Sequence, residues 1–258
     1  MSTAQGELVG KRAFVTGSSR GIGRATAALL HRRGASVVVH ARTASEHTRS
    51  LLSELQSAGE PNSGSRVALV TGALDGVDDA TAVWDSAVSA FGGLDVLVNN
   101  AGAWIASEIE SAEAWRVGWE ANLGLNLVAP SELCRRAILE FRAGDGGVIV
   151  NLASRSSHRG DDAEHLAYGA AKGGLLALTK GIARGYGRDG VLAYALAPGW
   201  VATDLSDGAI ERSVLDALPL GEVTPAGDVA EVIAFLATGR ARHATGATID
   251  ITGADYVR

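Results

Sequence analysis

The sequence predicts an α/β fold, in which a doubly wound parallel sheet of about seven strands carries helices on both faces. Two observations predict this class. Short apolar runs that suit buried strands alternate along the whole chain with longer helical patterns. The chain has 258 residues, of which 47% are hydrophobic and 20% charged, and this size and composition suit one globular unit. Residues 1–258 are therefore predicted to form a single domain.

The charge and the cysteine content exclude several classes of protein. The net charge is −6 and no run of Lys or Arg stands out, so a nucleic-acid partner is not expected. The one cysteine, Cys134, leaves no internal disulfide and suits a reducing compartment. Residues 1–10 lack the apolar core of a signal peptide, and no run of about 18 apolar residues suggests a membrane span. We therefore expect a soluble, cytoplasmic protein.

A strand, a glycine-rich turn, a helix and a second strand follow one another near the beginning of the chain. In a βαβ unit of this kind, glycines allow the backbone to turn tightly and to approach a pyrophosphate at the amino end of the helix. A purely structural turn is the alternative, but the flanking strand and helix favour a dinucleotide-binding domain of the Rossmann type. The segment comprises strand residues 12–16, the turn Gly17-Ser18-Ser19-Arg20-Gly21-Ile22-Gly23, a helix ending at Gly34 and strand residues 35–39.

Tyr168 and Lys172 stand four residues apart at the start of an apolar helical pattern, so both side chains lie on one face of the helix. A free phenol has a pKa of about 10, which makes it a poor acid or base at neutral pH. An ammonium group about 4 Å away could supply the roughly 4 kcal/mol that lowers this pKa to about 7. The pair therefore predicts a general acid/base, although the spacing alone also fits an ordinary exposed helix face.

Taken together with Tyr168 and Lys172, the glycine turn resembles that of the short-chain dehydrogenase/reductase family. Its spacing is Gly-x-x-x-Gly-x-Gly after Thr16, which differs from the Gly-x-Gly-x-x-Gly of other dehydrogenases. The resemblance implies an NAD(P)-dependent oxidoreductase that interconverts a carbonyl and a secondary alcohol on a small-molecule substrate. The overall look is that of 3-oxoacyl-(acyl carrier protein) reductases, and sugar, polyol and small-ketone dehydrogenases remain open as alternatives.

Two other kinds of protein on the same fold fit the chain less well. Dinucleotide-sensing regulators of this type lose the tyrosine or the lysine, and both residues are present here. Isomerases and epimerases of the extended type carry a longer carboxyl-terminal substrate domain, for which too few residues remain after Gly199. An enzyme of the oxidoreductase class is therefore expected.

The resemblance implies two catalytic residues beside Tyr168 and Lys172. Ser154 follows a predicted apolar strand, where the catalytic serine of the family leaves its strand, and would bond to the substrate oxygen. It stands one residue farther from Tyr168 than is usual in the family, so Ser156 remains an alternative. Asn122 matches the helix asparagine that, in the family, holds a water linking the active-site lysine to solvent.

Segments after two later strands complete the cofactor site that the resemblance implies. Asn99-Asn100-Ala101-Gly102 resembles the family segment that passes beneath the cofactor, and residues 198–203 (PGWVAT) resemble the segment that packs on the nicotinamide. The cofactor-binding residues expected on this basis are Gly17, Ser19, Arg20, Gly21, Ile22, Gly23, Arg42, Asn100, Ala101, Gly102, Tyr168, Lys172, Pro198, Gly199, Val201 and Thr203.

The residues near the predicted adenosine ribose favour NADP(H) over NAD(H). A carboxylate just after the second strand would bond the ribose hydroxyls and select NAD. Here the strand leads into His40-Ala41-Arg42, and no acidic residue follows until Glu46. Arg20 and Arg42 would flank the same ribose, and guanidinium groups suit a 2′-phosphate. Two solvent-facing arginines are the alternative.

Several further segments carry structural expectations. The charged loop of residues 155–165 contains two histidines and three carboxylates, but their spacing matches no metal-ligand signature, so no metal site is expected. Residues 204–218 are expected to form a mobile lid over the substrate. In a long helical stretch at residues 111–141, Trp115 and Trp119 are expected to pack rather than to act in catalysis.

Three positions depart from the family pattern without touching the proposed chemistry. Gly72 replaces an acidic or amide residue that contacts adenine in many members, which puts that contact in doubt. Tyr194 replaces a common strand asparagine, and Thr252 replaces a frequent glycine.

The resemblance also implies a homotetramer. The helices around residues 111–141 and 168–186 would pair across subunits. Small and apolar residues suit a close symmetric helix contact, and the candidates are Gly173, Gly174, Leu178 and Ile182.

Overall fold

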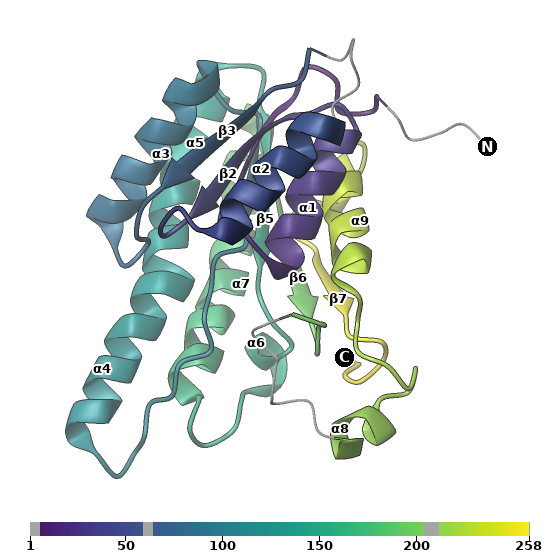
Figure 1. The fold of residues 1–258 in the computed structure, drawn as a ribbon. Helices are drawn as coiled ribbons and strands as arrows, with labels where there is room; N and C mark the ends of the chain where they lie inside the picture. The colour runs from purple at the N-terminus through teal and green to yellow at the C-terminus, as the bar shows by residue number, and fades with distance from the viewer. Residues whose placement is uncertain (1–5, 59–63, 204–211, 258) are drawn as a thin grey trace.

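The computed structural model describes residues 6–58, 64–203 and 212–257. Its centre is one sheet of seven parallel strands in the order β3-β2-β1-β4-β5-β6-β7. Helices cover both faces of the sheet (Figure 1), so the predicted fold class is confirmed. The strands are β1 Arg12–Val15, β2 Ser36–Ala41, β3 Val67–Thr71, β4 Val96–Asn99, β5 Gly147–Leu152, β6 Val191–Pro198 and β7 Thr248–Ile251.

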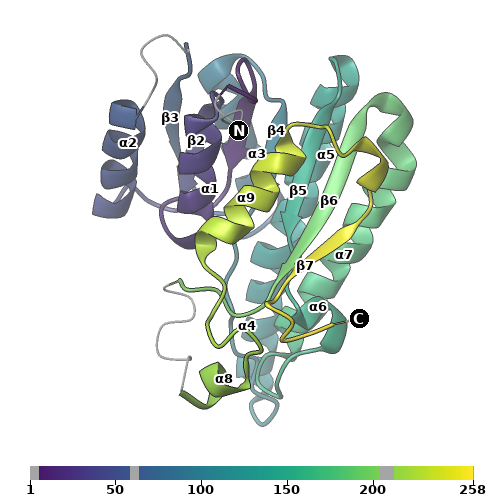
Figure 2. The ribbon, with the colours of Figure 1, turned by 90° about the vertical axis from the view of Figure 1, so that its right-hand side faces the viewer.

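Of the helices that the structure describes, six form two layers that cover the sheet, and the others lie in the connections. The helices are α1 Gly21–Arg32, α2 Glu46–Ala58, α3 Val77–Phe91, α4 Ala112–Leu123, the π-helical η1 Gly124–Val128, α5 Ala129–Ala143, α6 Ser156–Arg159, α7 Leu166–Tyr186, the 3₁₀ turn η2 Gly187–Asp189, α8 Arg212–Ala217, α9 Ala226–Ala237 and the 3₁₀ turn η3 Arg242–Ala244. α1, α2 and α9 lie on one face of the sheet, and α3, α5 and α7 lie on the other (Figure 2).

A large hydrophobic core lies between the sheet and the helices on each face. Successive residues of a strand point to opposite faces, so each strand contributes to both cores. In β1, Phe14 packs in the core beneath α3 and α5, whereas Ala13 and Val15 pack in the core beneath α1 and α9. Val38 of β2 joins Phe14 in the same way. Continuous apolar strands are typical of a parallel sheet that is covered on both faces.

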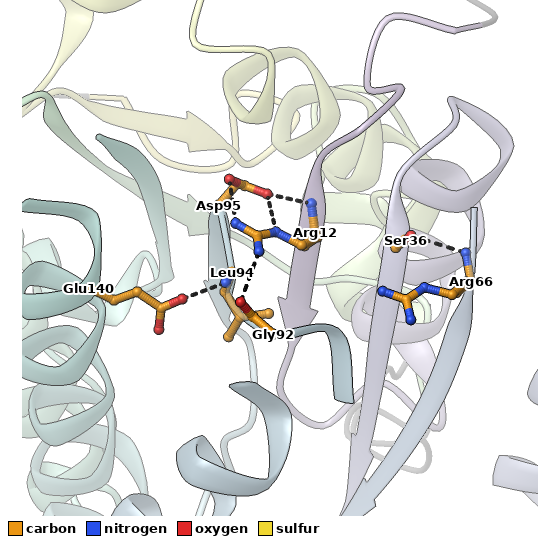
Figure 3. A network of polar contacts seen from close by, with 7 residues as sticks. All are labelled: Arg12, Ser36, Arg66, Gly92, Leu94, Asp95 and Glu140. Carbon is orange, nitrogen blue, oxygen red and sulfur yellow. Dashed lines mark hydrogen bonds and ion pairs between the residues drawn. The ribbon is translucent and has the colours of Figure 1, made fainter. Parts of the chain in front are cut away.

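Polar side chains fasten the amino ends of the strands (Figure 3). Asp95 Oδ2 accepts hydrogen bonds from the backbone nitrogen and from Nε of Arg12, at 2.8 and 2.9 Å. Arg12 also donates to the backbone oxygen of Gly92, and Glu140 Oε1 accepts from the backbone nitrogen of Leu94 at 2.6 Å. β1 and β4 are thereby tied together at the edge opposite their carboxyl ends.

The helical stretch predicted at residues 111–141 is one continuous rod, α4–η1–α5, with a π-helical turn in its middle. Ser111 caps its amino end, because the Ser111 hydroxyl accepts the backbone N–H three residues later at 3.1 Å. Gly124 begins the π-helical turn, where a Cβ would lie only 2.4 Å from the backbone oxygen of Asp75. The rod therefore packs closely on the loop that follows β3.

The tryptophans expected to pack, and two residues that depart from the family pattern, all make contacts within the fold. The rings of Trp115 and Trp119 lie 5.3 Å apart between centroids, so the two side chains pack on each other as predicted. Tyr194 is fully buried and donates its hydroxyl to the backbone oxygen of Ala241 at 2.8 Å. The Thr252 hydroxyl donates to a backbone oxygen of the carboxyl-terminal segment at 3.0 Å.

One of the residues expected to face another subunit, Ile182, faces the interior instead. Ile182 is buried in the core beneath α3 and α5, and Leu178 is partly buried against the same core. A Cβ on Gly174 would lie 2.9 Å from the side chain of Leu127, so this glycine serves packing within the chain. The expectation was wrong for Ile182, because the small and apolar residues of α7 do not by themselves reveal which face the sheet covers.

Most of the predicted lid at residues 204–218 lies outside the described residues, which resume at α8. Within the described part of the chain, no helix combines the length and the apolar character needed to cross a membrane. The described residues also contain no group of three or more His, Cys, Asp or Glu side chains that could hold a metal ion.

Candidate active site

A cavity of about 970 Å³ lies at the carboxyl ends of the strands, where the strand order reverses between β1 and β4. Ligands of open α/β sheets bind in such crevices. Every residue predicted to bind the cofactor lines this cavity, with the exception of Gly23. Among the predicted catalytic residues, Ser154, Tyr168 and Lys172 line it and Asn122 does not.

Side chains hold the glycine turn against the segment after β4. Thr16 Oγ1 accepts the backbone N–H groups of Asn100 and Ala101, both at 2.9 Å. Asn100 Nδ2 donates in return to the backbone oxygens of Thr16 at 2.8 Å and Gly17 at 3.1 Å. A Cβ on Gly17 would lie 2.9 Å from Ala101 Cα, so only glycine allows this approach. The two segments form one wall of the cavity.

The amino end of α1 is suited to an anion. Its N-cap residue, Arg20, provides no side-chain cap, and its first turn contains no acidic residue. Gly21 and Ile22 line the cavity, so the backbone N–H groups of this turn fit a pyrophosphate. Gly23 serves packing instead, because a Cβ there would lie 2.4 Å from Asn100 Nδ2. This glycine makes room for the asparagine and does not face the cavity.

His40 joins two cavity segments and was not singled out in the sequence. Its Nδ1 accepts the backbone N–H of Gly17 at 3.1 Å, so Nε2 carries the proton and donates to the backbone oxygen of Gly72 at 3.1 Å. Burial lowers the pKa of His40 to about 4, against the opposing effect of the bond to Gly72. The neutral imidazole therefore ties the glycine turn to the loop after β3.

Arg42 lines the cavity but is paired with a carboxylate. Its Nη1 and Nη2 donate to Oδ2 and Oδ1 of Asp75, at 3.0 and 2.5 Å. Along the sequence, no acidic residue follows Arg42 until Glu46. In the folded chain Asp75 lies beside Arg42, so the prediction that no carboxylate is near this side chain is wrong. Because β3 pairs with β2, the loop after β3 brings Asp75 beside the loop after β2. Arg20 lies exposed on the same cavity wall.

Tyr168 lies in the first turn of α7 and is half-buried on the cavity wall. Its phenol lies near the side chain of Ser154, which follows β5 and lines the same cavity. Ser154 Oγ also accepts the backbone N–H of Ser156 at 3.1 Å, which leaves the Ser154 proton for another acceptor. The structure thus brings Ser154 to the phenol, while Ser156 contributes its backbone.

Lys172 is buried one helical turn after Tyr168, and its Nζ donates to the backbone oxygen of Leu152 at 2.7 Å. Nζ lies 5.8 Å from the centroid of the Tyr168 ring. Burial lowers the pKa of Lys172 to about 8. Burial also raises the pKa of Tyr168 to about 12, although the nearby Ser154 hydroxyl opposes this. The expected lowering of the phenol pKa to about 7 is therefore wrong for the protein's own groups, because burial dominates.

Asn122 is fully buried in α4 and does not line the cavity. Its Nδ2 donates to the backbone oxygens of Ile105 at 2.9 Å and of Gly118 at 2.8 Å. It thereby anchors the segment that follows Gly102. Among the described residues, no contact joins Asn122 directly to Lys172.

Asn126, one turn later in η1, is a site residue that the sequence patterns did not reveal. It is fully buried, donates to the backbone oxygen of Ala103 at 3.0 Å and accepts from the backbone nitrogen of Ala103 at 3.3 Å. A Cβ on Gly102 would meet Asn126 Oδ1 at 2.8 Å and Lys172 Nζ at 3.3 Å, so both groups border this glycine. A second asparagine four residues after Asn122, in the same apolar helix, was the available signal.

Comparisons with known proteins decide the family. The family described as enoyl-(acyl carrier protein) reductase matches residues 17–253. The 3-oxoacyl-[acyl-carrier-protein] reductase FabG of Staphylococcus aureus is 32% identical over 250 residues, which cover 96% of this chain and 98% of the relative. The chain belongs to the short-chain dehydrogenase/reductase family. As a member, it is an NAD(P)-dependent oxidoreductase that acts on CH–OH and C=O groups.

Other known proteins are similar to this chain along nearly their whole length. The 3beta-hydroxysteroid dehydrogenase 1 of Eggerthella lenta is 33% identical over 254 residues, covering 96% of this chain and 94% of the relative. A blue fluorescent protein from a metagenomic library, solved in complex with NADPH, has a TM-score of 0.88, 30% identity and coverage of 97% and 100%. A short chain dehydrogenase from Burkholderia cenocepacia J2315, in complex with NADP, has a TM-score of 0.85, 31% identity and coverage of 96% and 98%.

In this short-chain dehydrogenase/reductase, the charged loop of residues 155–165 borders the end of the cavity near Tyr168. The ring of His165 stacks on that of Trp104, with centroids 3.6 Å apart. His165 Nδ1 also lies 2.6 Å from Asp162 Oδ1. Because Trp104 lines the cavity, the loop holds an aromatic wall at the substrate end.

Proposed function

We propose that the protein reduces the ketone of a 3-oxoacyl thioester with NADPH as the preferred cofactor. The observation that carries this proposal is that Ser154, Tyr168 and the buried Lys172 line one cavity, which also contains the glycine turn. The choice of substrate is supported by the relative from Staphylococcus aureus, which is named as a 3-oxoacyl-[acyl-carrier-protein] reductase.

The residues of the cavity suit carbonyl reduction. When bound, NADPH supplies the hydride, which protein side chains cannot provide. The raised pKa of Tyr168 keeps its proton on the phenol at neutral pH, ready to be donated to the carbonyl oxygen. Ser154 donates a hydrogen bond to the same oxygen and stabilises its developing negative charge. Lys172, with a pKa of about 8, carries the positive charge that stabilises the phenolate left behind.

The path that returns a proton to Tyr168 runs along the buried lysine. Lys172 Nζ and Asn126 Oδ1 border Gly102, and Asn126 holds both backbone groups of Ala103. Asn122, which the resemblance implied for this role, holds the neighbouring segment. In this proposal Asn126 takes the place of the helix asparagine and Asn122 supports it.

The preference for NADP(H) is supported by Arg20 and Arg42 on the cavity wall and by the two similar structures solved with NADPH and NADP. One charge-assisted contact to a 2′-phosphate gives about 10- to 150-fold preference. Because Asp75 already engages Arg42, we expect a preference near the lower end of this range. The kcat/KM values for NADPH and NADH measure it, and a higher value for NADH would contradict the proposal.

A hydrophobic ring ketone is the second candidate substrate. Several bulky apolar side chains line the cavity, and a flat substrate would pack against them. The relative from Eggerthella lenta, named as a 3beta-hydroxysteroid dehydrogenase, supports this alternative. The side chains are those of Trp104, Ile105, Leu125 and Trp200.

A panel of carbonyl substrates, followed by nicotinamide absorbance, tests the function. It should include 3-oxoacyl thioesters, ring ketones, sugars and small ketones, with the highest kcat/KM for the thioesters. Tyr168→Phe keeps the ring and removes the proton, so turnover on the best substrate should fall at least ~100-fold, the scale of general acid catalysis. NADPH binding, measured by fluorescence titration, should change little. Near-normal turnover of Tyr168→Phe, with the chemical step limiting, would disprove the mechanism.

The setting in which the enzyme works is also part of the proposal. Cys134 is buried and unpaired, which suits the reducing cytoplasm. The assembly we propose is a homotetramer built through the long helices α4–α5 and α7.

A further inference from the structure

The ion pair between Arg42 and Asp75 joins two loops that meet only in the folded protein. Arg42 follows β2, and Asp75 follows β3. The backbone of Asp75 is held on two sides: its nitrogen donates to Asp79 Oδ2 at 3.3 Å, and its oxygen lies against Gly124 of η1. The carboxylate is thus presented from a supported backbone, whereas Arg42 reaches it with a long side chain.

The pair is placed so that a ligand can break it. The two side chains are 63% and 51% exposed, and exposed ion pairs contribute little to stability. Arg42 also lines the cavity together with the glycine turn and His40, at the end that would hold the adenosine of the dinucleotide in the proposed function. A 2′-phosphate carries nearly two negative charges and accepts the same bidentate hydrogen bonds as a carboxylate. Asp75 and the phosphate therefore compete for one guanidinium group.

We propose that Asp75 sets the selectivity between NADPH and NADH by competing with the 2′-phosphate for Arg42. NADPH has to displace Asp75 from Arg42 and then binds near an unpaired carboxylate. NADH leaves the ion pair intact, so its binding does not depend on Asp75. This inference rests on the proposed function, because it requires a dinucleotide in the cavity. Asp75 acts through Arg42 and is a specificity-determining residue.

The test uses the two adenosine halves of the cofactors as probes. Calorimetry measures the binding of 2′,5′-ADP, 5′-AMP, NADPH and NADH to the full-length wild type and to Asp75→Asn at low ionic strength. We expect 2′,5′-ADP and NADPH to bind about 2- to 5-fold more tightly to Asp75→Asn, the scale of an exposed ion pair. The affinities for 5′-AMP and NADH should stay unchanged. The gain should shrink in 1 M salt, because salt screens exposed charges.

Two controls separate this competition from general electrostatics. Asp78→Asn removes the same charge from an exposed position three residues away in the first turn of α3, and should leave the ratio of affinities as in the wild type. In an Arg42→Ala background, Asp75→Asn should have no further effect, because the two residues act as one unit.

Three results would overturn the inference: no change on Asp75→Asn, an equal change for phosphorylated and unphosphorylated ligands, or the same change without Arg42. If the wild type binds none of the four nucleotides, the proposed function is overturned as well. If the nucleotides bind but their affinities do not change on Asp75→Asn, only the proposed competition for Arg42 is overturned.

Discussion

At the scale of single residues, the active site depends on which of two nearby serines meets the phenol. The Ser154 side chain lies near the Tyr168 phenol, whereas Ser156 contributes a backbone N–H to Ser154. Alanine at position 156 keeps that N–H. The hydroxyl at position 154 is therefore the one expected to act on the substrate oxygen.

We expect Ser154→Ala to lower turnover by roughly 10²-fold or more, as loss of a hydrogen-bond donor to a developing oxyanion does. Ser156→Ala should lose much less, because only its backbone is used. Steady-state kcat with saturating NADPH measures both variants. If Ser156→Ala shows the larger loss, the Ser156 hydroxyl is the one that acts on the substrate.

The positive charge of the buried Lys172 lowers the stability of the folded protein. Burial lowers its pKa from 10.5 to about 8, so between these pH values the folded protein binds fewer protons than the unfolded chain. Its contribution to the free energy of unfolding therefore rises with pH across this window. Relative to Lys172→Met, the wild type should gain up to about 3 kcal/mol between pH 7 and pH 10.5.

Urea unfolding of both proteins at several pH values measures this gain. Lys180→Met is the matched control, since Lys180 is exposed on the same helix, and its difference from the wild type should not depend on pH in this way. A Lys172→Met difference that is constant from pH 7 to 10.5 would mean that the folded pKa is ordinary. Lys172→Met should lose turnover, whereas Lys180→Met should keep it.

At the scale of elements, the π-helical turn η1 decides which asparagine borders the lysine. Asn126 lies on this turn and holds both backbone groups of Ala103, next to Gly102 and Lys172. Asn122 lies one turn earlier and holds Ile105. Both are fully buried, so helix position and not burial separates them.

We expect Asn126→Ala to lower kcat about 10- to 100-fold, because the segment beside Lys172 loses the contacts that position it. Asn122→Ala should lower kcat less. Thermal unfolding of each variant controls for stability, and the pH profile of kcat should shift in Asn126→Ala only. A larger or equal kcat loss in Asn122→Ala at matched stability would return the role to Asn122.

At the scale of the whole molecule, the outward face of α7 bears on assembly. Ile182 and Gly174 are used inside the chain. The exposed positions of α7 include Ala177, Gly181 and Gly185, and a Cβ on either of these glycines would meet nothing within 4 Å. A second copy of α7 could therefore approach this face closely.

We expect the protein to sediment as a homotetramer at micromolar concentration, and Ala177→Arg to shift it to smaller species, because a charged side chain cannot fit a close helix contact. Ser86→Arg, on the exposed face of α3, is the control and should leave the tetramer intact. A monomer for the wild type, or a tetramer for Ala177→Arg, contradicts this assembly through α7.

The fold class and the order of the strands along the chain were predictable from apolar runs and a glycine turn, and Tyr168 and Lys172 from a helical spacing of four. Ser154 was implied by the resemblance to the family. Only the tertiary structure showed that Asp75 pairs with Arg42, that Asn126 rather than Asn122 lies beside Gly102 and Lys172, and that burial raises the pKa of Tyr168. These depend on which strands are neighbours, on how a helix is wound and on how deeply a group is buried. Such quantities arise between segments far apart in the chain, and no local pattern encodes them.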